Sequence, residues 1–170
     1  SVKLRGDKPP VDFAAKFSLF PDRVQFSDVN LKLAKSLVKG EVAVRDLRKL
    51  NLAVRYDARL DWQELSSLFS LGKWQGEVQW KGQGTFTPGQ TRLDGDLTMD
   101  TKRTGVEGWE HVAWSVRSKL SLENSQATRG LRAKLENLQA DALGGKLRGA
   151  AEVSLRDADL RIHSDLQAEQ

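Results

Sequence analysis

The chain has 170 residues, no cysteine and a formal net charge of +4, with 27 basic and 23 acidic side chains. The lack of cysteine excludes disulfides and thiolate metal sites, and no apolar stretch reaches the ~18 residues of a transmembrane helix. The charges of both signs are interspersed instead of forming a basic face with aromatic residues among them, so we expect no nucleic-acid partner.

From Val2 to Ala168 apolar and polar residues alternate, and this period of two predicts strands with one apolar and one polar face. Turn-forming residues such as Pro21-Asp22 separate the strands. Because the chain opens directly in this alternation, we expect it to be a segment of a longer polypeptide. The first predicted strands are Val2–Arg5, Val11–Leu19, Val24–Leu33, Val38–Val44 and Leu50–Leu60.

The third of these strands changes phase. Val24 and Phe26 are its first apolar residues, and Val29 and Leu31 continue the pattern on odd numbers. One extra residue in a strand produces such a shift, so Ser27-Asp28 is predicted to be a β-bulge.

One segment, 61–70, departs from the alternation and predicts a short helix. Asp61 followed by Glu64 three residues later resembles a capping box. We expect this helix to lie across an edge of the sheet.

The clearest alternation follows in Lys73–Thr87, where the even positions are apolar or glycine. A turn is expected at Gly105–Gly108. The remaining predicted strands are Leu93–Met99, Val112–Leu122, Leu131–Leu135, Leu147–Leu155 and Leu160–Ala168.

Two stretches of the chain match at a constant offset of 109 residues. Val29 corresponds to Leu138, and Gly40 corresponds to Gly149. We therefore predict one β-repeat segment over 1–170, with related units near 24–60 and 131–168 and the short helix between them.

The predicted fold is all-β: one long curved, taco-like or U-shaped sheet of about ten to eleven strands with an apolar groove. About eleven strands at roughly 4.8 Å spacing would extend on the order of 50 Å, which one short helix cannot cover. In-phase glycines such as Gly82 and Gly95 would leave room on the apolar face for a ligand.

A set of in-phase apolar residues is predicted to line this groove. Large flat tryptophan rings suit variable apolar ligands, although ordinary core packing explains them as well. The predicted lining residues are Phe13, Phe17, Leu31, Val42, Val54, Trp74, Val78, Trp80, Phe86, Leu93, Leu97, Met99, Trp114, Val116, Leu120, Leu135, Leu147, Val153 and Ile162.

No catalytic, metal or cofactor site is predicted. His111 and His163 lie on separate strands without ligand spacing around them. Asp94 and Asp96 share the solvent face of one strand and lack the further oxygen ligands of a calcium loop. We therefore expect a protein that is not an enzyme.

The chain resembles the TamB/AsmA-like repeat proteins in two places. One is the pattern Trp74-Gln-Gly76-Glu-Val78 followed by Gly82-Gln-Gly84, and the other is the segment from Leu138 through Gly144-Gly145 to Gly149. The resemblance implies a β-taco that carries lipid acyl chains across the periplasm, within a parent protein anchored in the inner membrane by a helix outside this segment. It also implies a role in outer-membrane biogenesis and a BamA-like outer-membrane partner of the full-length protein. No catalytic motif is carried over.

Two alternatives remain open. The same sheet could be a periplasmic scaffold that shields outer-membrane protein strands at its open edges. It could also be a structural β-solenoid with a filled core.

Overall fold

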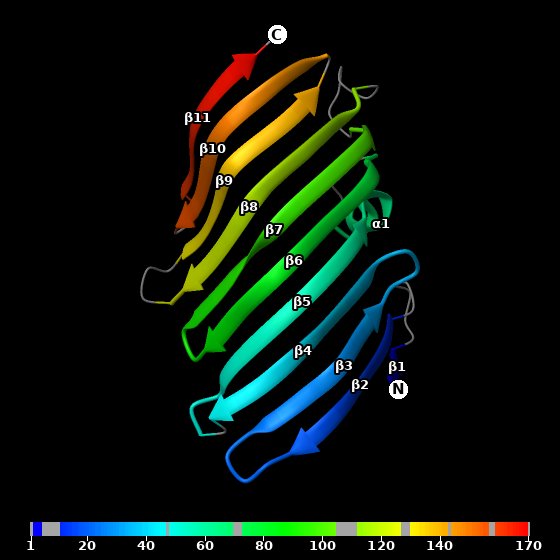
Figure 1. The fold of residues 1–170 in the computed structure, drawn as a ribbon, viewed down its shortest axis with the longest axis vertical. Helices are drawn as coiled ribbons and strands as arrows, with labels where there is room; N and C mark the ends of the chain where they lie inside the picture. The colour runs from blue at the N-terminus through cyan, green and yellow to red at the C-terminus, as the bar shows by residue number, and fades with distance from the viewer. Residues whose placement is uncertain are drawn as a thin grey trace.

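A computed structural model describes residues 2–4, 11–46, 48–69, 73–104, 112–126, 130–142, 144–156 and 159–169. Within these residues the fold is all-β, as predicted: one open antiparallel sheet whose strand order follows the sequence, with a single short helix at one rim (Figure 1). The strands are β1 (Val2–Leu4), β2 (Val11–Leu19), β3 (Val24–Lys32), β4 (Leu37–Asp46), β5 (Asn51–Asp61), β6 (Gln75–Thr87), β7 (Gln90–Arg103), β8 (Trp114–Ser125), β9 (Gly130–Ala142), β10 (Gly145–Arg156) and β11 (Asp159–Glu169).

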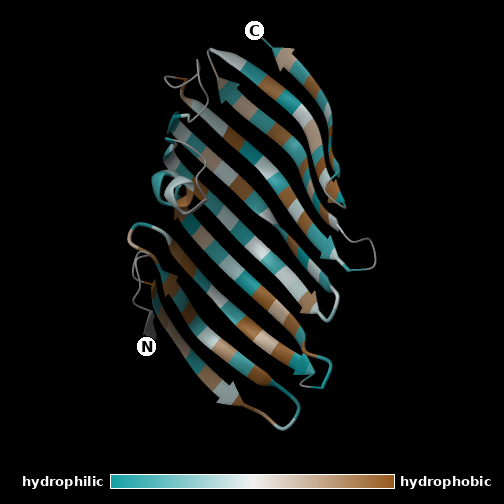
Figure 2. Cartoon of the chain, turned by 180° about the vertical axis from the view of Figure 1, so that it is seen from behind, coloured by the Kyte–Doolittle hydropathy of each residue, from teal (hydrophilic) through white to brown (hydrophobic). Residues whose placement is uncertain are grey.

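The sheet is long, curved and twisted, and its two ends do not meet (Figure 1). Each strand pairs with the strand before it and the strand after it, so β1 and β11 are the edges of the described sheet. Alternating residues along each strand differ in hydropathy, which Figure 2 shows as bands across the ribbons. Side chains therefore separate into an apolar face and a polar face.

The bulge predicted at Ser27-Asp28 is confirmed. The pairing of β3 with β4 shifts register between Phe26 and Val29, and Asp28 has a φ of +51°. A left-handed residue in a strand locally bends and twists it, and aspartate is among the residues that tolerate this conformation.

The same irregularity recurs in β9, where Asn137 has a φ of +52°. It stands 109 positions after Asp28. The pairing of Val29 with Gly40 in the first unit matches the pairing of Leu138 with Gly149 in the second. The repeat that was weak in sequence is thus visible in the register of the strands.

The helix α1 runs over Trp62–Phe69, close to the predicted segment; the predicted last residue, Ser70, lies outside the described residues. The Asp61 carboxylate caps its first turn and accepts a hydrogen bond from the Glu64 N–H at 2.9 Å. Glu64 does not complete a capping box. Its carboxylate instead accepts the N–H of Ser36 at 2.8 Å and that of Lys35 at 3.3 Å, and so ties the helix to the β3–β4 turn.

Two strands begin later than predicted. β6 starts at Gln75, so Trp74 lies outside the ladder, and β8 starts at Trp114. The turn predicted at 105–108 lies outside the described residues, as does His111.

Candidate functional site: the apolar face

The register of the sheet places the predicted lining residues on one face, because directly paired residues project to the same side. One row crosses ten strands and contains only apolar residues and glycine. From β2 to β11 it consists of Phe17, Phe26, Val42, Val54, Gly84, Leu93, Leu122, Ala133, Val153 and Ile162.

The other predicted lining residues lie in parallel rows of the same face. The pairs that place them are Phe13 with Leu31, Trp80 with Leu97, Val78 with Met99, Met99 with Val116, Leu120 with Leu135, Leu147 with Ala140, and Phe86 with Leu52. Trp114 pairs with Ala142, and Trp74 joins this face through its ring contact with Trp114. We call this surface the apolar face.

Little else covers the apolar face in the described part of the chain. Beyond contacts between sheet neighbours, the principal packing is that of α1 against β5 and β6. Side chains in the middle of the sheet are nevertheless buried, as for Val78 and Val116 at 8% and 5% exposure. Both belong to the row that runs from Leu60 through Val78 and Met99 to Val116, at the side of the sheet where α1 packs on β5 and β6.

Cover is lost toward both ends of the sheet. Phe17 on β2 is 73% exposed and Ile162 on β11 is 69% exposed, although both belong to the ten-strand row. β11 is an edge of the described sheet, and β1 pairs only with 11–13 of β2, so neither Phe17 nor Ile162 has a described strand on both sides. The apolar face is therefore most buried in its central strands near α1 and open to solvent at its two ends.

Tyr56 is a residue of this face that sequence reasoning did not single out. Its hydroxyl donates to the Asp94 carbonyl at 3.2 Å, so the side chain reaches from β5 across β6 to β7. Its ring packs edge-on against Trp80 at 4.9 Å. Burial, and then the nearby Asp94 charge, raise the pKa of Tyr56 to about 12.

The path of Tyr56 corrects the interpretation of the in-phase glycines. Gly82 pairs with both Tyr56 and Gly95, and a Cβ atom at Gly82 would overlap the backbone of Asp94 and Gly95. The Leu93 side chain similarly occupies the space beside Gly84. These glycines allow close approach of neighbouring strands, and the protein's own side chains use the room they leave.

A tryptophan cluster lies where α1 meets the sheet. The ring of Trp62 is 5.3 Å from that of Trp74, which is 6.3 Å from that of Trp114. The indole N–H groups of Trp62, Trp114 and Trp80 are buried without a hydrogen-bond acceptor in the protein. The contacts among Trp62, Trp74 and Trp114 are thus made through their rings.

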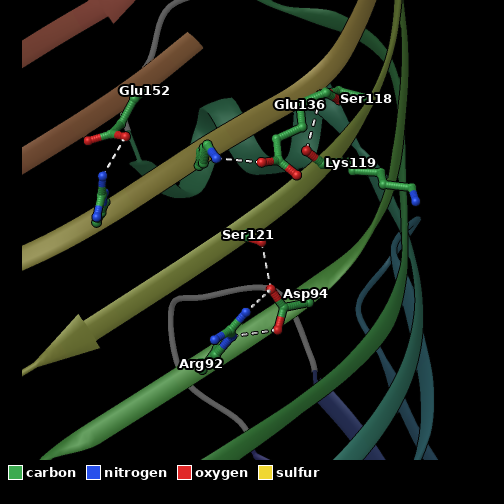
Figure 3. A network of polar contacts seen from close by, with 9 residues as sticks. Arg92, Asp94, Ser118, Lys119, Ser121, Glu136 and Glu152 are labelled. Atoms are coloured by element: carbon green, nitrogen blue, oxygen red, sulfur yellow. Dashed lines mark hydrogen bonds and ion pairs between the residues drawn. The ribbon is translucent and has the colours of Figure 1, made fainter. Parts of the chain in front are cut away.

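The opposite face is charged and internally paired. Asp94 accepts hydrogen bonds from Arg92 at 2.8 Å and from Ser121 at 2.6 Å, and these contacts lower the pKa of its carboxyl group (Figure 3). Lys134 pairs with Glu136 on this face (Figure 3). The Ser118 hydroxyl, which donates to the Glu136 backbone carbonyl at 2.9 Å, belongs instead to the apolar face, because Ser118 pairs with Leu97.

The surface pockets of the described chain are lined mainly by residues of the polar face. One of about 520 Å³ has the paired residues Ala43 and Ala53 on its lining, with Arg45, Arg55 and Arg92 among the polar side chains around it. These pockets lie between long side chains of mixed charge. The apolar face instead extends along one side of the open sheet.

Among the described residues no group of histidine, cysteine, aspartate and glutamate side chains is arranged to hold a metal ion. No described helix has both the length and the apolarity needed to cross a bilayer. Comparison of the chain with protein-family models, with curated proteins and with solved structures finds no match.

Proposed function

We propose that the apolar face holds the acyl chains of lipids, and that the protein is a non-enzymatic carrier of lipid between the inner and outer membranes. The observation that carries this proposal is the uninterrupted apolar row from Phe17 to Ile162, which crosses ten strands and has no second layer over it in the described part of the chain. Soluble proteins rarely leave an apolar surface of this extent without a partner.

The chemistry of the face suits long, flexible hydrocarbon better than a defined small molecule. Aliphatic side chains dominate its rows, with Trp80 and Phe86 as flat aromatic walls. Each buried CH₂ contributes roughly 0.8 kcal/mol, and a surface that is similar from row to row repeats this gain at successive positions. A chain can therefore slide along the face without a deep trap while its head group stays in water.

The resemblance to TamB/AsmA-like proteins supports a location in the periplasm, within a parent protein anchored in the inner membrane. It also supports a role in outer-membrane biogenesis with a BamA-like partner of the full-length protein. We expect no cofactor.

The test uses lipids whose acyl chains carry bromine, which quenches nearby tryptophan fluorescence. We expect quenching of the wild-type protein and stoichiometric phospholipid in native mass spectrometry after mild purification. Val78→Asp and Leu97→Glu should abolish both, because each places a charge on the apolar face. Gln79→Asp and Thr98→Glu are matched controls, since they stand one residue along the same strands on the polar face.

Val78 is buried, so Val78→Asp could fail to fold. Ile162→Asp keeps the experiment decisive, because this side chain is 69% exposed and its loss should leave the fold intact. Folded Ile162→Asp and Leu97→Glu proteins that bind brominated lipid as well as the wild type would overturn the proposal.

A scaffold for outer-membrane proteins is a second candidate, and β11 favours it. Every residue of this strand is exposed, and one of its edges has no partner within the described sheet. An unpaired edge is a template for a further strand. Photo-crosslinking from position 163 to nascent barrel proteins, without lipid in the purified protein, would favour the scaffold. The third alternative, a β-solenoid with a filled core, has less support because the described sheet does not close.

A further inference from the structure

We propose that one corner of the sheet is a docking site for the surface of a bilayer that contains anionic lipids. The corner is formed by the β2–β3 and β4–β5 turns, which lie at the same rim because β3 and β4 are paired neighbours (Figure 1). We call it the basic rim. It consists of Leu19, Phe20, Arg23, Arg45, Arg48, Lys49 and Leu50.

The basic rim exposes large apolar side chains together with cations. Leu19 is 73% exposed and Leu50 is 59% exposed, and Phe20 stands beside them in the first turn. The Arg23 guanidinium lies over the Phe20 ring at 4.4 Å, which holds a cation and an aromatic ring at the same tip. Apolar tips that can enter the head-group region, flanked by cations that attract anionic lipid, are the chemistry of interfacial membrane binding.

Of the four cations of the rim, only Arg23 has a carboxylate partner among the described residues. Arg23 directly precedes Val24 and Arg45 directly follows Val44, so the pairing of Val24 with Val44 brings the backbones of both arginines to the same rim. The two carboxylates nearby are already engaged: Asp22 pairs with Arg23 at 3.6 Å, and Asp46 accepts backbone N–H groups of its own turn.

The conformation of Leu50 also indicates that this side chain is not placed in the turn to pack against the sheet. It has a φ of +48°, an uncommon conformation for a bulky side chain, and yet it points into solvent instead of into the sheet. A short polar residue would suit this turn better if the turn only had to join two strands.

The internal repeat supplies a comparison within the same molecule. At the offset of 109 that aligns the two bulges, Arg48-Lys49-Leu50 corresponds to Asp157-Ala158-Asp159. The basic and apolar residues of the first unit are thus replaced by acidic residues in the second. The requirements of the repeated strands do not explain this difference, which makes the rim chemistry a property of one corner.

The rim is also continuous with the apolar face. Leu19 pairs with Val24, and this row continues through Val44, Leu52 and Phe86. A bilayer docked at the basic rim would therefore meet the open, exposed end of the apolar face at β2. Docking extends the lipid function proposed above, but it can be tested without it.

The experiment measures sedimentation of the protein with vesicles of phosphatidylcholine, alone or mixed two to one with phosphatidylglycerol. We expect binding to the mixed vesicles. Combined replacement Arg45→Gln, Arg48→Gln and Lys49→Gln should weaken binding at least about tenfold, since three surface cations are lost. The β4–β5 turn should survive, because Asp46 contacts the backbone N–H groups of Arg48 and Lys49 and not their side chains.

The charge-matched control is Lys39→Gln, Lys81→Gln and Lys119→Gln, three exposed lysines in the middle of the polar face. We expect it to bind within about threefold of the wild type, because charges beyond a Debye length of the membrane are screened. The apolar tips are tested by Leu19→Ser with Leu50→Ser, against the control Leu155→Ser with Leu160→Ser, an exposed pair at the far end of the sheet. Only the rim pair should weaken binding.

Equal losses in rim and control variants would overturn the proposal, as would a wild-type protein that binds neither vesicle. The wild type could instead bind an acidic polypeptide and not the vesicles. If the triple variant Arg45→Gln, Arg48→Gln and Lys49→Gln then loses that binding, the rim recognises a protein and not a membrane. Tryptophan quenching by brominated lipid in detergent measures acyl-chain binding on the apolar face without any vesicle, so it tests the proposed function separately from docking. Rim variants should retain that quenching, and vesicle binding without any quenching would refute the carrier function alone.

Discussion

The ring of Tyr56 offers a direct test of how the glycine rows are filled, because it is the only tyrosine in the chain. Its hydroxyl donates to the Asp94 carbonyl at 3.2 Å after crossing Gly82. Tyr56→Phe keeps the ring and removes this hydrogen bond. We expect a loss of about 0.5–1.5 kcal/mol in the free energy of unfolding at neutral pH, the net value of one such bond.

The pH dependence of that difference has a definite sign. Burial, followed by the Asp94 charge, raises the pKa of Tyr56 from 10.0 to about 12. A group whose folded pKa is raised adds stability below its unfolded pKa and loses it as the pH rises through the folded value. The full shift would correspond to about 2–3 kcal/mol. Because part of the ring is in contact with water, we expect about 1–2 kcal/mol of this to be realised.

Two measurements follow the same residue. The near-ultraviolet absorbance of tyrosinate should show a midpoint near 12 in the folded protein and near 10.0 in denaturant. Urea unfolding of the wild type should lose stability between these pH values relative to Tyr56→Phe, and the subtraction cancels the lysines that titrate in the same range. A tyrosinate midpoint near 10.0 in the folded protein, or parallel stability curves for the two proteins, would refute the buried path of the ring.

Three further changes test other contacts of the fold. Gly82→Val should lower the free energy of unfolding in urea by about 2–4 kcal/mol, because the valine side chain would overlap the backbone of Asp94 and Gly95. Gly145→Ala is the control and should cost less than about 1 kcal/mol, since a Cβ atom there meets only ordinary contacts. Burial raises the pKa of Glu64, but hydrogen bonds from Ser36 and the neighbouring backbone outweigh it and hold the pKa below its ordinary 4.5. The stability advantage of the wild type over Glu64→Gln should therefore be present above pH 4.5 and shrink as the pH falls below it; a constant difference would mean that the carboxylate does not anchor α1. Leu50→Asn should stabilise the protein by about 0.5–1 kcal/mol, since asparagine tolerates a positive φ, and destabilisation would show that Leu50 packs against the sheet.

The strands and their faces were predictable because their information is local. Alternation with period two assigns each residue to a face, and the phase shift at Ser27-Asp28 marks the bulge that the register confirms. The shared face of distant residues such as Phe17 and Ile162 follows once the strands pair in sequence order.

Contacts that depend on how strands and turns meet were not predictable. Glu64 looked like half of a capping box, but its partner is the Ser36 N–H of a turn 28 residues earlier. Tyr56 looked like one more in-phase apolar residue, and only its reach to Asp94 shows that it occupies the space over Gly82. Exposure at the ends of the sheet likewise depends on the number of neighbouring strands, which alternation does not encode.

The two repeated units allow the requirements of the fold to be separated from those of the basic rim. Arg48→Asp, Lys49→Ala and Leu50→Asp together give the first unit the turn residues that the second unit has at the same offset. The fold should tolerate this exchange, because aspartate accepts a positive φ and Asp46 still caps the turn through backbone N–H groups.

Binding to anionic vesicles should be lost in that variant, since two cations and an apolar tip are replaced by two anions and alanine. Bromine quenching by solubilised lipid should persist, because no residue of the apolar face has changed. If instead the exchanged protein unfolds at lower urea and still sediments with anionic vesicles, the turn is a structural element. The contrast between the two units would then have no bearing on membranes.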